Sequence, residues 1–216
     1  MKKKISIVIP VYNEIATIRR IVEEVKKVDV GLEKEIIIVD DASTDGTREY
    51  LLNLNDKNIK VLFHGKNKGK TECIKTALKK ITGDIAIIQD ADLEYLPTKN
   101  YKILLEPILE GWADVVYGSR FLGVHRVFYF WHYFANKFLT TLVNIFYDTM
   151  LSDMETGAKA FKSEVLKNMN FTSKRFGFEV EVTAKIFKKD IGCMKFLFII
   201  MEEITDKGKR LNLLMG

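Results

Sequence analysis

The stretch that sets the fold occupies residues 83–95 and reads GDIAIIQDADLEY. Its apolar run, residues 85–88, does not alternate with polar positions, which is typical of a strand covered on both faces. Two aspartates, Asp90 and Asp92, follow this run directly. Comparable apolar runs lie at residues 5–9, 35–39, 60–63 and 114–117. Because segments with helical spacing separate them, the pattern predicts an α/β fold with a mostly parallel central sheet and helices on both faces.

The segments between these strands predict the helices. Apolar residues at helical spacing indicate helices at residues 15–25, 44–54, 70–81 and 101–109. The second half of the chain differs. There we expect one or two amphipathic helices in the aromatic-rich segment 127–147, a short strand at 157–161 and a helix at 178–188.

Composition excludes several classes of protein. The 216 residues are 47% hydrophobic and 29% charged, as in a globular domain. A net charge of +5 is too small to indicate nucleic-acid binding, and none is expected. The two cysteines, Cys73 and Cys193, are too far apart for a zinc motif and fit a reducing cytoplasm. No apolar stretch is long enough for a signal peptide or a membrane span, so we expect a cytoplasmic location.

Polar clusters follow the predicted strands where each strand ends. Asp90 and Asp92 can turn toward one divalent cation, which prefers oxygen ligands. The pair Asp40 and Asp41 ends the second strand, where an acid can accept hydrogen bonds from a nucleotide. Lys70 opens a predicted helix at a position that suits an anionic group. Because ligands of parallel sheets bind at the carboxyl ends of the strands, these clusters predict one site.

These segments resemble the inverting family 2 glycosyltransferases with the GT-A fold, and most closely the dolichyl- or polyprenyl-phosphate hexosyltransferases. The resemblance covers roughly residues 5–190, and its segments are IVIPVYNE (7–14), IIIVDDASTDGT (36–47), NKGK (67–70), GDIAIIQDADLEY (83–95), DVVYGSRF (114–121), DMETGAKAFKSEVL (153–166) and RFGFEVEVTAKI (175–186). It implies transfer of a mannose or glucose from a GDP- or UDP-linked donor to dolichyl or polyprenyl phosphate.

The resemblance also implies residue roles. Nucleotide contacts are expected from Pro10, Tyr12, Glu14, Asp40, Asp41, Lys70, Asp90 and Ala91, with Asp40 as the acid that binds the base. The metal, Mg²⁺ or Mn²⁺, is expected on Asp90, Asp92 and Glu94. Asp92 is also expected to act in catalysis. Arg120 resembles the arginine that holds the acceptor phosphate, and Arg126, with His132 behind it, is the candidate for a second basic group.

Three alternatives concern the acceptor and the reaction. A lipid phosphate is already anionic and needs no general base, whereas a glycan hydroxyl would need a carboxylate near Asp153 or Glu155. A protein that binds nucleotide sugars without catalysis is the third possibility. The aromatics of residues 127–147 fit either core packing or a helix lying at a membrane surface, with Arg126 and Lys137 facing anionic lipid. We therefore expect a peripheral protein at the cytoplasmic face of a membrane.

The whole chain is predicted to be one catalytic domain. Residues 1–120 would form the nucleotide-sugar half and residues 121–193 the acceptor half. Residues 194–216 depart from the family, whose members continue with a tyrosine- and lysine-rich loop. Permissible codons for this segment, shifted in frame, can spell VPIYYYGRNYRQGKKIKLIDG, so we hypothesise a frameshift before Lys195.

Overall fold

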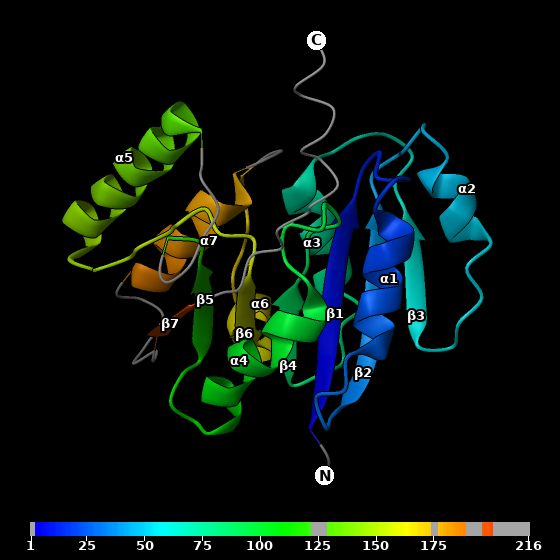
Figure 1. Ribbon diagram of the computed structural model, residues 1–216, viewed down its shortest axis with the longest axis horizontal. Coiled ribbons are helices and arrows are strands. Elements are labelled where there is room, and N and C mark those ends of the chain that lie inside the picture. Colours follow the sequence, from blue (N-terminus) through cyan, green and yellow to red (C-terminus); the bar gives the residue numbers. More distant parts are fainter. Residues whose placement is uncertain (1–2, 122–128, 174–176, 189–195, 201–216) are drawn as a thin grey trace, which may run out of the picture.

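A seven-stranded sheet organises the part of the chain described by the computed structural model, residues 3–121, 129–173, 177–188 and 196–200 (Figure 1). Its order is β3-β2-β1-β4-β6-β5-β7. The strands are β1 (Lys4–Val11), β2 (Glu33–Asp40), β3 (Ile59–Phe63), β4 (Ile85–Ile88), β5 (Val115–Ser119), β6 (Lys159–Lys162) and β7 (Phe196–Ile200). The helices are α1 (Ile18–Lys27), α2 (Thr47–Leu52), α3 (Lys70–Leu78), α4 (Pro97–Leu109), α5 (Phe130–Tyr147), α6 (Ser163–Lys167) and α7 (Phe178–Phe187).

The predicted mostly parallel sheet is confirmed. Strands β1, β2, β3 and β4 pair in parallel, and so do β5 and β7. Strand β6 is antiparallel to both β4 and β5, so it separates two strands that are neighbours in sequence. The antiparallel pairing places the start of β6 beside the end of β4, because Lys159 is opposite Ile88.

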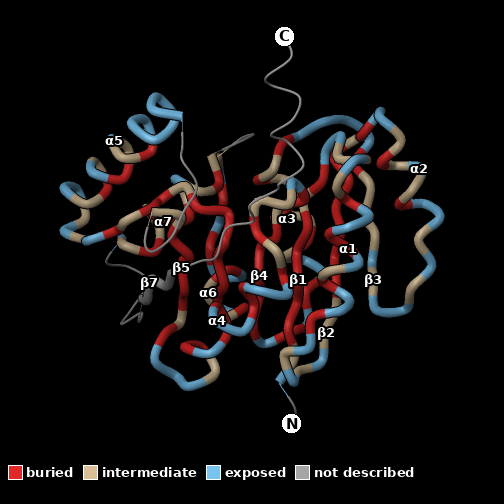
Figure 2. The backbone as a smooth tube through the Cα atoms, in the orientation of Figure 1, coloured by how far each residue is buried: buried red, intermediate tan, exposed pale blue. Residues whose placement is uncertain are grey.

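The two faces of the sheet carry separate hydrophobic cores. Helices α1 and α4 cover one face, packing Ile21 and Leu104 against residues such as Ile7 of β1. Helices α3, α6 and α7 cover the other face, where Ile74 and Val182 pack. Figure 2 shows buried residues running along the central strands. The unbroken apolar runs of the sequence therefore correspond to strands covered on both sides.

Helix α5 buries polar residues and exposes aromatic ones, which is the reverse of the pattern in an ordinary surface helix. Its buried residues are Asn136, Thr140 and Val143, while most of its aromatic side chains are exposed to solvent; Tyr147 is the exception and packs near Phe187. The exposed aromatic face of α5 consists of Phe130, Trp131, Tyr133, Phe134, Phe138 and Phe146. Of the two interpretations of this segment, core packing is wrong for these side chains. Figure 1 shows α5 standing beyond the β5 side of the sheet.

The segment 194–216, predicted to be atypical, lies outside the described residues except for β7. The frameshift before Lys195 stays a prediction. The division of the domain into a nucleotide-sugar half and an acceptor half also stays a prediction. Among the described residues, no helix is long and apolar enough to cross a membrane.

Glu35 ties the amino ends of β1 and β2 to the turn before β4. Its carboxylate accepts hydrogen bonds from Ser6 Oγ at 2.5 Å, from the Thr82 backbone N–H at 2.5 Å and from Lys4 Nζ at 2.9 Å. Burial alone would raise the pKa of Glu35, but these bonds outweigh it and lower the pKa to about 2. The charged form is therefore the one that the fold stabilises.

Glu35→Gln is expected to lower the free energy of unfolding by about 2 kcal/mol near neutral pH, because hydrogen bonds to a charged group are lost. The folded pKa lies below the unfolded value of 4.5, so this contribution is full above pH 4.5 and disappears as the pH falls toward 2. Denaturant unfolding of both proteins across this pH range measures the difference. A difference that does not change with pH would contradict the assignment.

Candidate functional site

A cavity of about 820 Å³ opens at the edge where the parallel strands end. It is lined by Pro10, Val11, Tyr12, Glu14, Asp41, Asn67, Gly69, Lys70, Cys73, Asp90, Ala91, Asp92, Glu94, Arg120, Glu155, Gly157, Glu179 and Val180. These residues come from the end of β1, from the loops after β1, β2, β3, β4 and β5, from α3 and α7, and from the loop before β6. The structure thus brings together most of the site residues predicted from the sequence.

Three of these loops contain a residue other than glycine whose backbone is in the left-handed conformation. Asn13, Ala42 and Leu93 have φ values of 56°, 64° and 63°, and each lies shortly after β1, β2 or β4. A side chain in this conformation costs roughly 1–2 kcal/mol. Such strain persists where the surrounding contacts enforce it, as they do at many functional sites.

Of the described residues that were predicted to form the site, Asp40 does not line the cavity. Asp40 is completely buried and accepts hydrogen bonds from Arg48 and from the Ser43 N–H. Its neighbour Asp41 faces the cavity instead. Arg126 lies outside the described residues, and His132 is exposed on α5.

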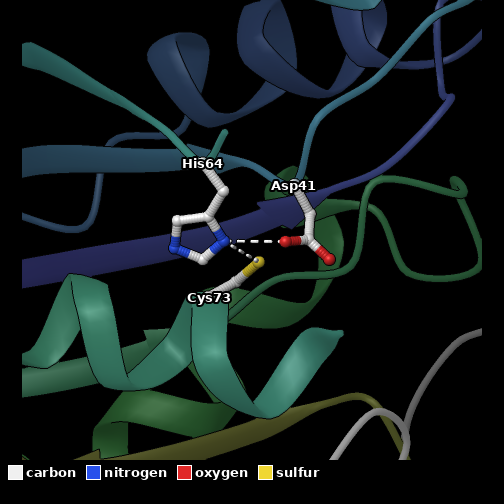
Figure 3. A group of neighbouring side chains, drawn as sticks. All are labelled: Asp41, His64 and Cys73. Atoms are coloured by element: carbon white, nitrogen blue, oxygen red, sulfur yellow. Dashed lines mark hydrogen bonds and ion pairs between the residues drawn. The ribbon is translucent and has the colours of Figure 1, made fainter. Parts of the chain in front are cut away.

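Asp41, His64 and Cys73 form a buried group at the cavity wall (Figure 3). The carboxylate of Asp41 accepts a hydrogen bond from His64 Nδ1 at 2.7 Å and from the backbone N–H groups of Lys68 and Gly69 at 3.0 and 2.7 Å. Burial alone would raise the pKa of Asp41, but these donors lower it below its usual value. Asp41 therefore holds the loop that leads into α3.

The three side chains have ligand atoms close enough to hold a metal ion. Their hydrogen bonds are nevertheless complete without one. His64 contacts Thr76 Oγ1 through Nε2 at 2.9 Å, so both ring nitrogens have partners. Burial raises the pKa of the Cys73 thiol, which keeps it protonated. A positioning role for the group follows from these contacts.

The three residues predicted to bind the metal lie in one acidic part of the cavity. Burial, together with the charge of Asp90, raises the pKa of Asp92, although the Glu94 N–H donates to its carboxylate. Burial also raises the pKa of Glu94 against the opposing effect of Arg120. Among the described residues, no cationic side chain forms an ion pair with Asp92, whereas Asp90 and Glu94 each have such a partner. This part of the cavity holds negative charge that a cation would neutralise.

Lys70 is the first residue of α3 and joins Asp90 to α7. Its Nζ lies 2.6 Å from Asp90 Oδ1 and 2.6 Å from Glu179 Oε1. Burial alone would lower the pKa of Lys70, but the two carboxylates raise it. The ammonium is therefore charged and held between two acids.

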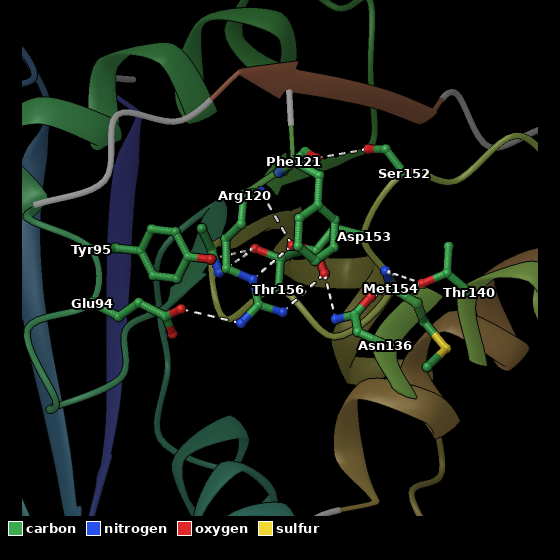
Figure 4. A network of polar contacts seen from close by, with 12 residues as sticks. Glu94, Tyr95, Arg120, Phe121, Asn136, Thr140, Ser152, Asp153, Met154 and Thr156 are labelled. Atoms are coloured by element: carbon green, nitrogen blue, oxygen red, sulfur yellow. Dashed lines mark hydrogen bonds and ion pairs between the residues drawn. The ribbon is translucent and has the colours of Figure 1, made fainter. Parts of the chain in front are cut away.

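Arg120 forms the centre of a second network (Figure 4). Its Nε and Nη2 donate to the two oxygens of Asp153 at 2.8 and 3.0 Å, and its Nη1 donates to Glu94 at 3.1 Å. Asn136 of α5 donates to the same carboxylate of Asp153 at 2.9 Å. Burial alone would raise the pKa of Asp153, but Arg120 lowers it. The network connects the end of β5 with α5 and with the loop after β4.

The cavity residues that the predicted site did not include are Val11, Asn67, Gly69, Cys73, Glu155, Gly157, Glu179 and Val180, and three of these need comment. Glu179 stands in the first turn of α7, and an acid in that position of the predicted helix was the available signal. Glu155 was considered only as a base for a hydroxyl acceptor. Gly157 gave no signal, yet a Cβ there would collide with Asp90 Oδ2, so glycine is required for the close approach.

Comparison with known proteins identifies the family. The model of the family described as "Glycosyl transferase family 2" matches residues 6–169, which is most of the chain. The chain belongs to glycosyl transferase family 2.

The family 2 chain is similar to several curated proteins. It is 34% identical over 125 residues to a dolichol-phosphate mannosyltransferase of Pyrococcus furiosus, covering 57% of this chain and 35% of that protein. It is 28% identical over 196 residues to the glycosyltransferase AglJ of Haloferax volcanii, covering 87% of this chain and 59% of that protein. The chain thus spans from about one third to somewhat more than half of these relatives.

Solved structures confirm the GT-A fold class. Glucosyl-3-phosphoglycerate synthase of Mycobacterium tuberculosis, in complex with Mn²⁺, UDP and phosphoglyceric acid, superposes with a TM-score of 0.71 at 19% identity. The alignment covers 92% of this chain and 68% of that one. At 19% identity, the similarity between the two structures shows a shared fold and no more than that.

Asp153→Asn is expected to lower the free energy of unfolding by about 3 kcal/mol, because it leaves a largely buried guanidinium without its main partner. The control is Glu23→Gln, which removes an exposed ion pair with Lys27 and should change stability by less than about 1 kcal/mol. Denaturant unfolding measures both. Equal effects of the two substitutions would show that the Arg120 network does not stabilise the fold.

Proposed function

We propose that this family 2 chain transfers a hexose from a nucleoside diphosphate sugar to a phosphate-bearing acceptor in a metal-dependent reaction. The observation that carries the proposal is the charge of the cavity. Seven carboxylates line it, against two cationic side chains among the described residues, Lys70 and Arg120. A diphosphate would be repelled from such a cavity unless a divalent cation entered with it.

The acidic residues suit a hard cation. Asp90, Asp92 and Glu94 line the same cavity, and carboxylate oxygens are ligands that Mg²⁺ and Mn²⁺ prefer. When bound, the ion would stabilise the negative charge that grows on the departing diphosphate. The chain's own groups would do the remaining work. Lys70 would neutralise a phosphate oxygen, and the loops after β1 and β2 would enclose the nucleoside.

Arg120 supports a phosphate on the acceptor. A guanidinium has five N–H donors, of which Asp153 and Glu94 engage three. The remaining two leave room for a phosphate oxygen beside the donor. Asp153 is unsuited to be a general base, because both its oxygens accept hydrogen bonds and its pKa is lowered. The similarity to a dolichol-phosphate mannosyltransferase supports dolichyl or polyprenyl phosphate as the acceptor.

The test is a panel of GDP- and UDP-linked mannose and glucose with polyprenyl phosphate and Mn²⁺ or Mg²⁺. We expect radiolabelled hexose to enter the lipid extract with one donor, and Asp92→Asn to reduce the rate about 100-fold. Binding of a nucleotide without turnover under any donor would instead support a protein that binds nucleotide sugars without catalysis.

Glu155 supports a second candidate, transfer to a glycan hydroxyl. It lines the cavity and, unlike Asp153, could accept the proton of an attacking hydroxyl. Under this alternative Glu155→Gln should lower kcat by at least about 100-fold. With a phosphate acceptor the same substitution should change kcat only slightly, so one variant separates the two candidates.

The exposed aromatic face of α5 supports a membrane surface as a further partner. The face lies on the helix that binds Asp153 through Asn136, so it adjoins the proposed acceptor side. Trp131 and Phe130 are 73% and 65% exposed. Aromatic side chains of this kind insert at the boundary between lipid headgroups and acyl chains. A polyprenyl phosphate would reach the cavity from such a surface, which supports peripheral binding to a membrane; the cytoplasmic face of that membrane is part of our proposal.

Substitution of Trp131 and Phe134 by serine is expected to reduce sedimentation with phosphatidylglycerol vesicles at least about tenfold, because two apolar side chains no longer insert. The matched control is Trp112→Ser, since Trp112 is 66% exposed but lies outside α5, just before the amino end of β5. An equal loss with the control would contradict the assignment. Self-association of the wild type that the double substitution removes would indicate a second copy as the partner.

A further inference from the structure

The position of Lys70 bears on how the proposed metal enters the cavity. Asp90 offers two carboxylate oxygens. Oδ2 lies so close to Gly157 that no Cβ could be accommodated there. Oδ1 is directed to Lys70, whose Nζ is 2.6 Å away. The side chain of Lys70 is 17% exposed, so water screens this pair only partly.

Glu179 holds the ammonium in this position from the other side. Its Oε1 also lies 2.6 Å from Lys70 Nζ. Burial alone would raise the pKa of Glu179, but Lys70 and then Lys159 lower it, so Glu179 stays charged. Lys70 is thus held between two carboxylates, one from the loop after β4 and one from α7, and Glu179 has no need of a metal to balance its charge.

Asp92 completes the argument because no cationic side chain among the described residues forms an ion pair with it, although the charge of Lys70 acts on it from a greater distance. A divalent cation at Asp92 could add Asp90 Oδ1 as a second ligand only if the Lys70 ammonium moved away. Two like charges cannot share one carboxylate oxygen at ligand distance without strong repulsion. The anionic diphosphate of a donor would give the ammonium a new partner.

We propose that Lys70 occupies the cation position at Asp90 in the donor-free protein, and that the nucleoside diphosphate draws Lys70 away and admits the divalent cation. Lys70 is thereby a positioning residue that makes metal binding depend on the donor. The inference rests on the proposed metal site of Asp90 and Asp92. By thermodynamic linkage the metal must favour donor binding by the same factor.

The experiment measures binding of Mn²⁺ alone, by the electron paramagnetic resonance signal of the ion that stays in solution. Lys70→Gln removes the charge but retains hydrogen-bonding groups for Asp90 and Glu179. It is expected to bind Mn²⁺ at least about tenfold more tightly than the wild type without nucleotide. Lys70→Arg keeps the charge and should bind Mn²⁺ as weakly as the wild type, and it serves as the second variant if Lys70→Gln does not fold.

The control is Lys75→Gln. Lys75 lies on the same helix and pairs with Glu72, outside the cavity lining, so its removal should leave Mn²⁺ affinity unchanged. Adding Asp92→Asn to Lys70→Gln should abolish the gain. The inference is overturned if Lys70→Gln binds Mn²⁺ no better than the wild type, if Lys70→Arg binds it tenfold better, or if the gain survives Asp92→Asn.

The same measurements with UDP or GDP separate this inference from the proposed function. If the wild type binds Mn²⁺ in the presence of nucleotide and Asp92→Asn prevents it, the proposed metal site stands whatever the result for Lys70. If neither nucleotide supports Mn²⁺ binding, the metal-dependent function itself fails.

Discussion

The ion pair between Arg120 and Asp153 joins parts of the protein that are distant in sequence. Both oxygens of Asp153 receive N–H groups of one guanidinium, while Asn136 brings α5 to the same carboxylate. A pair removed from water in this way is costly to break, because either partner alone would be left charged and desolvated. The position of α5 and that of the loop that carries Glu94 consequently depend on one contact.

The same principle of paired charge extends across the cavity. Lys70 balances Asp90 and Glu179, Arg120 balances Asp153 and Glu94, and donors from His64 and the backbone balance Asp41. Lys159 differs, because it is fully buried, donates to the Thr156 carbonyl and lies 4.6 Å from the ring centre of Tyr117. Burial lowers the pKa of Lys159 to about 8. The positive charge of Lys159 lies near Glu179 and helps to lower the pKa of that carboxyl group.

The strands and the strand-end clusters were predictable because each has a local cause. Apolar runs of four or five residues define strands covered on both faces, and Asp90 and Asp92 follow one of them directly. The sequence of a strand does not show which other strands it pairs with. Residues 157–161 were expected to form a strand, but neither the antiparallel direction of β6 nor its insertion between β4 and β5 was expected. That Asp41 lines the cavity whereas Asp40 does not also depends on tertiary contacts, those of Asp40 with Arg48 and of Asp41 with His64.

The insertion of β6 also has a kinetic consequence. Gly157 and Asp90 are adjacent in space but 67 positions apart in the chain, and the wall of the cavity that they share exists only after β6 has paired with β4. Contacts of such sequence separation form late, because a long loop must close before they do. A nascent chain that ended near residue 120 would contain Lys70, Asp90 and Asp92 but would lack Gly157, against which Asp90 packs. The cavity is therefore a product of the last stages of folding.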